Sequence, residues 1–294
     1  MSTNDELGTG TVTAGGIDFT YLECGEGPLA LCLHGYPDSA YTWRHLLPEL
    51  AAAGYRAVAP FMRGYSPTST APDGRYQVGV LGVDANDLHE ALGGDGSAVL
   101  IGHDWGAMGA YAGATLAPDR WRRVVAASVL PGPIAAQGFL SYDQLRLSWY
   151  MFFQLTALSD FVVAADDYEF ITRLWQDWSP GYDCAEDVAR FAACMDGAGR
   201  LEAALGYYRQ TLQPELQDPA LADAQNAAFS IPPQPLLYLH GADDGCMSAA
   251  LAAGVDEVLT APGSRSVIVP DAGHFLQLEQ PAAVNGEILR FLSE

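Results

Sequence analysis

The chain of 294 residues has 36 acidic and 14 basic side chains, and its net charge at pH 7 is −22. Such a surface repels phosphate backbones and anionic membranes, which excludes nucleic acid and membranes as partners. A hydrophobic share of 49% beside 17% charged residues is typical of a globular protein with a large core.

The five cysteines are scattered and lack the spacing of metal ligands, so we expect no metal, reduced thiols and a cytoplasmic protein. Residues 1–6 are polar and acidic, which is unlike a secretory signal. The longest apolar stretch, residues 139–165, is interrupted by Asp143, Arg146 and Asp160, so we expect no membrane span.

Apolar runs and turn residues predict an alternation of strands and helices along most of the chain. The expected strands are residues 9–13, 17–23, 29–33, 55–59, 97–101, 124–130, 236–239 and 266–269. The expected helices are one that follows Ser39 as its cap and contains Trp43 to Leu50, then residues 78–92, 107–116, 248–259 and 276–292.

This alternation is typical of a doubly wound, mainly parallel α/β sheet, which binds ligands at the carboxyl ends of its strands. The pattern changes between residues 134 and 230, where aromatic helical segments follow one another without a clear strand. We therefore expect residues 1–133 and 231–294 to form the two parts of the α/β core, and residues 134–230 to form an inserted helical lid.

The stretch from Gly102 to Gly106 joins a predicted strand to a predicted helix, with Asp104 in the middle. Two glycines around a central side chain are typical of a nucleophile elbow, a sharp turn that presents that side chain. A carboxylate is a good nucleophile toward sp3 carbon that bears a leaving group, and the alkyl ester it forms can be cleaved by water. A free Asp is already ionised at neutral pH and needs no activating base. Alternatively, Asp104 merely caps the helix.

The nucleophile reading requires an acid and a histidine later in the chain, each directly after a strand. Asp243 and Asp244 follow the strand at 236–239, and His274 follows the strand at 266–269. Nucleophile, acid and histidine in this order are the α/β-hydrolase triad. A histidine pKa near neutrality suits a general base, and the acid fixes its tautomer.

Across nearly its whole length the chain resembles the α/β-hydrolase superfamily, and most of all the epoxide hydrolases. The resemblance implies that Asp244, in the G-x-x-D turn of residues 241–244, is the triad acid, with Asp243 as the alternative. It also implies that residues 34–37 form the H-G-x-P oxyanion loop with a cis Tyr36–Pro37 bond. The backbone N–H groups of Tyr36 and Trp105 would then stabilise the charge on the Asp104 carbonyl oxygen.

Epoxide hydrolases protonate the opening ring with two lid tyrosines, and the resemblance assigns this role to Tyr150 and Tyr208. The segment after Tyr150 is one residue shorter than in the family, which leaves open whether Tyr150 or Trp149 faces the pocket. Trp105, Trp149 and Phe153 are expected to contact the substrate. The expected partners are an apolar epoxide and water, with no cofactor, in a monomer or homodimer that serves detoxification.

Two alternatives remain open. A haloalkane dehalogenase would use the same triad, with Trp105 and one of the lid tryptophans as halide donors; these are Trp149, Trp175 and Trp178. A catalytically idle ligand receptor on this fold would typically lack a triad member, whereas this chain has all three.

Overall fold

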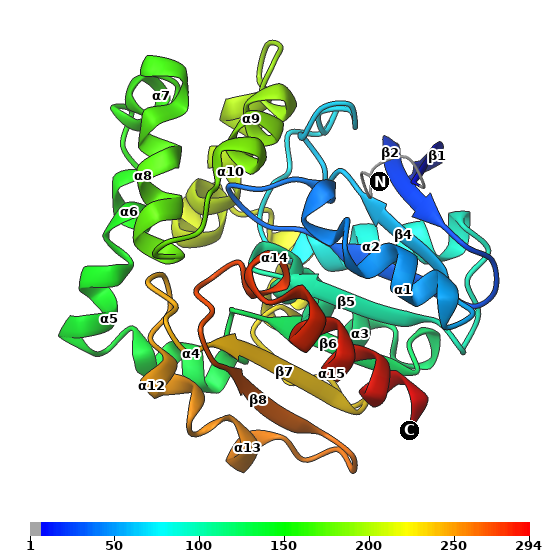
Figure 1. Ribbon diagram of the computed structural model, residues 1–294. Helices are drawn as coiled ribbons and strands as arrows, with labels where there is room; N and C mark the ends of the chain where they lie inside the picture. The colour runs from blue at the N-terminus through cyan, green and yellow to red at the C-terminus, as the bar shows by residue number, and fades with distance from the viewer. Residues whose placement is uncertain (1–6) are drawn as a thin grey trace.

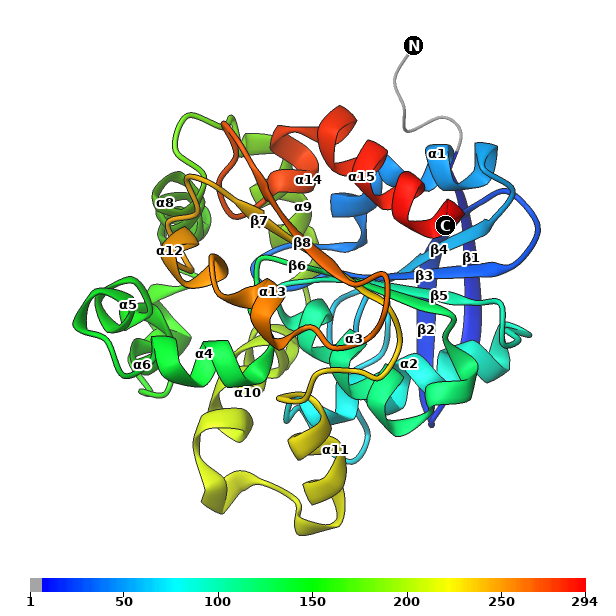
Figure 2. The ribbon, with the colours of Figure 1, turned by 90° about the horizontal axis from the view of Figure 1, so that it is seen from below.

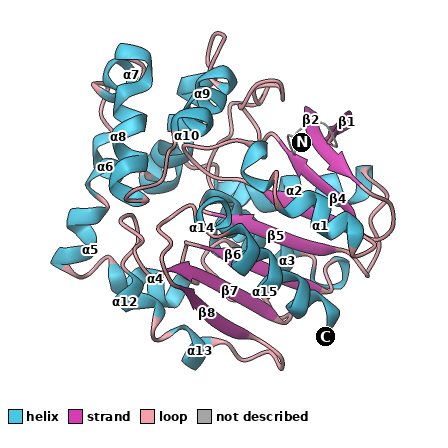
Figure 3. Cartoon of the chain, in the orientation of Figure 1, coloured by secondary structure: helices cyan, strands magenta, loops and turns pink. Residues whose placement is uncertain are grey.

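The computed structural model describes residues 7–294, so the polar start at residues 1–6 of the expected core lies outside the described residues. The fold is built on an eight-stranded sheet with the order β1-β2-β4-β3-β5-β6-β7-β8, in which all pairs from β4 to β8 are parallel (Figure 3). The strands are β1 (Gly8–Ala14), β2 (Ile17–Cys24), β3 (Leu29–Leu33), β4 (Arg56–Pro60), β5 (Val99–His103), β6 (Arg123–Ala127), β7 (Leu236–Gly241) and β8 (Arg265–Val269).

The burial of each strand follows its place in the sheet. β3 and β5 are buried at every position, as expected for apolar strands covered on both faces. β1 and β2 form an antiparallel hairpin at the edge, where β1 is buried only at Ala14 and β2 alternates buried and more exposed residues from Ile17 to Tyr21. Gly15 and Gly16 at its turn have positive φ angles, which glycine adopts without steric cost.

Helices cover both faces of the sheet (Figure 2). One face carries α1 (Leu46–Ala52), α14 (Leu276–Glu279) and α15 (Pro281–Ser293), and the other carries α2 (Gly79–Ala91), α3 (Trp105–Leu116) and α11 (Ala222–Ala227). Small residues let α2 and α3 approach closely, since a Cβ on Gly82 would collide with the Ala112 side chain. This packing fixes α3, whose N-terminus carries the elbow.

Between β6 and β7, residues 128–235 contain helices and no strand. Apart from α11, these helices are α4 (Gly132–Gly138), α5 (Tyr142–Leu147), α6 (Trp149–Phe153), α7 (Ser159–Val162), α8 (Glu169–Trp178), α9 (Ala185–Cys194) and α10 (Arg200–Leu212). Figure 1 shows α5 to α10 beyond the carboxyl ends of the parallel strands, the edge where we expected ligands to bind. Two short helices after β7, α12 (Ala249–Ala252) and α13 (Val255–Val258), complete the fold.

The structure corrects several predicted elements. The helix expected at 248–259 is broken into α12 and α13, and the one at 276–292 is broken before Pro281, which cannot continue a helix from the preceding turn. Ser39 precedes a short 3-10 helix and makes no capping hydrogen bond with its side chain. β6 ends at Ala127, because Ser128 has a positive φ of 66°. Among the described residues, no helix has the length and apolar character to cross a membrane.

Candidate active site

The turn between β5 and α3 holds Asp104 in a backbone conformation that few non-glycine residues adopt, with φ 54° and ψ −122°. The neighbouring glycines make this turn possible. A Cβ on Gly106 would collide with the Leu33 carbonyl, and one on Gly102 would collide with the Gly106 carbonyl. The sequence therefore encodes a strained elbow, and the Asp104 carboxylate stands at the end of the central strand.

The expected triad residues meet at the carboxyl edge of the sheet. His274 Nε2 lies 3.6 Å from Asp104 Oδ2, and His274 Nδ1 lies 3.1 Å from Asp244 Oδ2. All three side chains are buried. Asp243, the alternative acid, is exposed. His274 therefore lies between the carboxylates of Asp104 and Asp244, and Asp243 is not part of this group.

Backbone and side-chain donors fix the acid and the histidine. The N–H groups of Cys246 and Met247 donate to Asp244 Oδ1 at 2.7 and 2.9 Å. The His274 carbonyl accepts the Ser128 hydroxyl at 2.7 Å and the His103 ring nitrogen Nε2 at 2.9 Å. The sequence did not single out Ser128, because a serine directly after a strand carries no motif.

The electrostatics of the triad favour a charged pair. Burial by itself would raise the pKa of Asp244, but the charge and hydrogen bond of His274 outweigh it and lower the pKa. Burial opposes the charged form of His274 as well. The charge of Asp244 and the hydrogen bonds with Asp104 and Asp244 raise the pKa of His274 above its usual value. The resting site thus favours an imidazolium between two carboxylates.

The loop after β3 supplies a donor to the nucleophile. The N–H of Tyr36 donates to Asp104 Oδ1 at 2.8 Å, and the Tyr36–Pro37 bond is cis. Only glycine fits at position 35, since a Cβ there would collide with Asp104 Oδ1. The His34 ring nitrogen Nε2 accepts the Met62 N–H at 3.0 Å, which holds the loop in place. Burial lowers the pKa of His34 to about 4, so its ring is neutral. The matching role of the Trp105 N–H stays a prediction.

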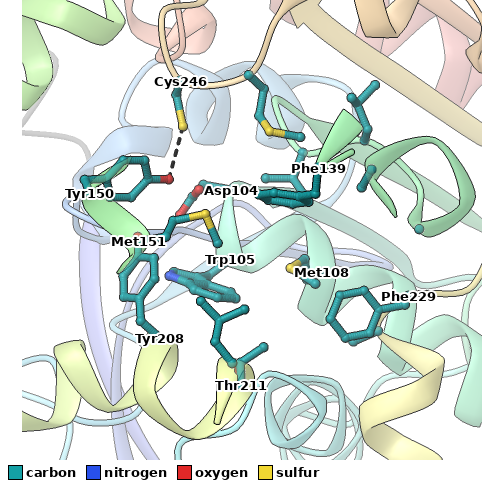
Figure 4. Close-up of a pocket in the computed structure, with 17 residues that line it drawn as sticks. Asp104, Trp105, Met108, Phe139, Tyr150, Met151, Tyr208, Thr211, Phe229 and Cys246 are labelled. Atoms are coloured by element: carbon teal, nitrogen blue, oxygen red, sulfur yellow. Dashed lines mark hydrogen bonds between the residues drawn. The ribbon is translucent and has the colours of Figure 1, made fainter. Parts of the chain in front are cut away.

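A largely apolar cavity opens in front of Asp104 (Figure 4). It lies between the core, the helices α4, α6 and α10, and the residues that directly follow α11. The polar side chains on its wall are Asp104, Tyr150, Tyr208, Thr211 and Cys246. The apolar part of the wall consists of Trp105, Met108, Val129, Leu130, Gly132, Ala135, Phe139, Met151, Leu212, Ala228, Phe229 and Met247.

Both expected tyrosines lie on this wall, and two other expected contacts do not. The Tyr150 and Tyr208 ring centroids are 5.9 Å apart, and the Tyr208 ring packs against Trp105 at 4.8 Å. Burial raises the pKa of both phenols, which keeps them protonated as donors. Trp149 is 47% exposed and packs with Phe153 at 6.1 Å outside the cavity. Successive residues of a helix point about 100° apart, so with Tyr150 facing inward its neighbour faces outward.

The sheet order, the elbow at the end of the central strand and the acid and histidine after later strands define the α/β-hydrolase class. Comparison with known proteins agrees. The family model described as the alpha/beta hydrolase fold matches residues 28–281. Epoxide hydrolase 3 of Xenopus tropicalis is 33% identical over 95% of this chain and 76% of its own length. An epoxide hydrolase of Caballeronia sordidicola is 31% identical over 96% of this chain and 92% of its own.

Solved structures lead to the same group. An epoxide hydrolase of Bacillus megaterium in complex with an inhibitor superposes with a TM-score of 0.81 at 25% identity, covering 97% of this chain and 100% of that one. Epoxide hydrolase VrEH1 of Vigna radiata gives a TM-score of 0.79 at 26% identity, with 98% of each chain covered. The chain belongs to the α/β-hydrolase family and, within it, to the epoxide hydrolases.

Proposed function

We propose that the protein hydrolyses an apolar epoxide to a vicinal diol through an alkyl ester on Asp104. The observation that carries the proposal is the placement of the Asp104 carboxylate and two protonated phenols, Tyr150 and Tyr208, on one apolar cavity. A nucleophile and acids for the leaving oxygen are the two requirements of epoxide opening.

In the first step the Asp104 carboxylate attacks a ring carbon, and the C–O bond of the epoxide breaks. The oxygen takes a proton from Tyr208 or Tyr150, whose hydroxyls form stronger hydrogen bonds in an apolar wall than in water. The products of this step are a hydroxyalkyl ester on Asp104 and a tyrosine that regains its proton from solvent.

In the second step His274 takes a proton from water, which attacks the ester carbonyl of Asp104. The tetrahedral oxyanion is stabilised by the Tyr36 N–H, which already donates to Asp104 Oδ1 at 2.8 Å. The oxyanion then collapses and the bond between the carbonyl carbon and the alkyl oxygen breaks. The released oxygen takes the proton from His274 to complete the diol, and the Asp104 carboxyl loses its proton to solvent. Esterification removes the negative charge that lies 3.6 Å from His274 Nε2 and helps to raise its pKa. The pKa of His274 therefore falls in the intermediate, where the imidazole must be neutral to act as a base.

The helices between β6 and β7 serve as the lid in this proposal. α6 contributes Tyr150 and Met151 to the wall, and α10 contributes Tyr208, Thr211 and Leu212. An apolar wall favours a hydrophobic substituent on the epoxide, because its burial releases water from both surfaces.

Dehalogenation is a second candidate, favoured by one observation. Among the described residues, the buried Trp105 Nε1 has no hydrogen-bond partner, which leaves this donor available for a halide. The second halide donor is harder to find. Trp149 is exposed, and Trp175 Nε1 donates to the Pro37 carbonyl at 3.0 Å.

The test is product analysis with styrene oxide and a bromoalkane, for wild type, Asp104→Ala and the control Asp243→Asn. We expect diol from the epoxide, lost in Asp104→Ala and kept in the control, whose side chain is exposed. A His274→Ala variant should accumulate an ester, visible as added mass on the intact protein. Bromide release without diol would move the protein to dehalogenase chemistry, and diol formation by Asp104→Ala would contradict the ester mechanism.

A further inference from the structure

A thiol lies in the wall of the cavity beside the triad, and the proposed reaction does not use it. Cys246 Sγ is 3.3 Å from the Tyr150 hydroxyl. Figure 4 marks this contact with a dashed line. Sγ, a nitrogen of His274 and an oxygen of Asp244 all lie within 4.8 Å of one another. A nucleophilic atom, a cationic ring and a phenol thus surround the space in which Asp104 meets its substrate.

We infer that Cys246 is a covalent modification site for uncharged, apolar α,β-unsaturated carbonyl compounds, whose addition blocks the cavity. The apolar wall that suits a hydrophobic epoxide also suits such a molecule, and any compound that reaches Asp104 also reaches Sγ, because both line the same cavity. Trp105 Nε1, buried in that wall and without an acceptor among residues 7–294, provides a donor for the carbonyl oxygen.

The addition needs no co-reactant. Sγ forms a bond to the β-carbon, the electron pair of the C=C bond moves toward the carbonyl oxygen, and that oxygen takes a proton from the Tyr150 hydroxyl. Tyr150 regains a proton from the Cys246 thiol. Overall, the sulfur is added to the β-carbon and the proton of the thiol ends on the carbonyl oxygen. The resulting thioether, unlike an ester on Asp104, is not cleaved by water.

The environment of Cys246 favours this relay, in which a proton passes from the thiol to Tyr150 and from Tyr150 to the carbonyl oxygen. Burial raises the pKa of the Cys246 thiol, so the group is protonated at rest. Contact with the His274 imidazole offsets part of that effect and stabilises negative charge as it develops on sulfur. The thiol therefore reacts through the proton transfer to Tyr150 and the charge of His274 rather than as a free thiolate.

The other four cysteines lie outside the cavity. Cys32 is buried in β3, Cys184 and Cys194 are buried near α9, and Cys24 is partly exposed on β2. A small uncharged reagent should therefore distinguish Cys246 from the buried thiols by access, and a charged reagent should reach Cys24 instead.

The experiment treats the full chain with N-ethylmaleimide or with a sulfonated, charged maleimide, and follows intact mass, peptide maps and residual hydrolytic rate. The variants are Cys246→Ser, Tyr150→Phe and the control Cys24→Ser, each compared with its own starting rate. We expect N-ethylmaleimide to modify Cys246 and inactivate wild type and Cys24→Ser. Loss of the hydroxyl in Tyr150→Phe should slow the modification of Cys246 about three- to tenfold, the value of one hydrogen bond.

Mass on Cys246 is read without any assay of turnover, so its outcome is independent of whether the epoxide reaction is correct. Modification of Cys24 alone by both reagents, or equal modification of Cys246 by the charged and uncharged maleimides, would overturn the proposal. An unchanged rate of modification in Tyr150→Phe would refute the relay. If Cys246→Ser fails to fold, the peptide map of wild type still decides which thiol reacts.

Discussion

Replacing Asp244 with Asn changes one oxygen of the triad to nitrogen and leaves the shape of the side chain nearly unchanged. Asp244 Oδ1 accepts the N–H groups of Cys246 and Met247, and Oδ2 faces His274 Nδ1 at 3.1 Å. Asn must keep its single oxygen on those two N–H groups, so its NH2 group replaces Oδ2. It then donates to His274 Nδ1, and this forces the histidine proton onto Nε2.

With its proton on Nε2, His274 cannot take a proton from water, and ester hydrolysis fails while attack by Asp104 continues. The corresponding Asp to Asn change in a serine protease triad lowers kcat by about 10⁴, which amounts to about 5.4 kcal/mol of activation free energy. We expect a loss of this order in the second step, together with loss of the charge that raises the pKa of His274.

The assay is rapid-quench turnover of styrene oxide with intact-mass detection of the ester. Asp244→Asn should form an ester stoichiometric with the protein and release almost no further diol. Asp243→Asn is the matched control, because that neighbouring carboxylate is exposed. If Asp244→Asn turns over within tenfold of wild type and no ester accumulates, the assignment of acid and tautomer is wrong.

Three further predictions concern other parts of the molecule. Gly35→Ala places a Cβ against Asp104 Oδ1 and should lower kcat by about a hundredfold or more, with thermal unfolding by circular dichroism as the check that the fold persists. Because protonated His274 is no base, the fraction of ester trapped on quenching should rise as the pH is lowered, and a constant fraction would contradict its role. Asp84→Ala leaves the buried Arg63 without its partner and should cost about 3–5 kcal/mol in urea unfolding.

The parts of the site that depend on backbone geometry could be predicted from the sequence. Strand, glycine turn and helix leave few alternatives for residues 102–106, and the structure gives Asp104 the strained φ that such an elbow requires. The G-x-x-D turn likewise placed Asp244 rather than Asp243 beside His274. In each case the spacing fixes which backbone groups and side chains can reach the carboxyl edge of the sheet.

The parts that depend on side-chain packing could not be predicted in this way. Whether Tyr150 or Trp149 faces the cavity depends on the rotation of α6 about its axis, which its contacts with Trp178 and the core determine. Cys246 belongs to no sequence motif. It lies at the cavity because its N–H donates to Asp244 Oδ1 in the same turn that holds Asp244. The break before Pro281 could have been predicted, since proline is disfavoured in the interior of a helix.

The end of α8 links the helical segment to the triad. The carbonyl of Trp178 accepts the N–H of Gly245 at 3.1 Å and the N–H of His274 at 2.9 Å. These two loops follow different strands, so one backbone group of the helical segment fixes the loop of the acid relative to the loop of the histidine. Trp178 also packs its ring against Tyr150 at 4.7 Å and against His274 at 5.1 Å. A displacement of α8 would therefore disturb the ring-opening acid and the hydrolytic base together, and the segment that covers the cavity is part of the geometry of catalysis in both proposed steps.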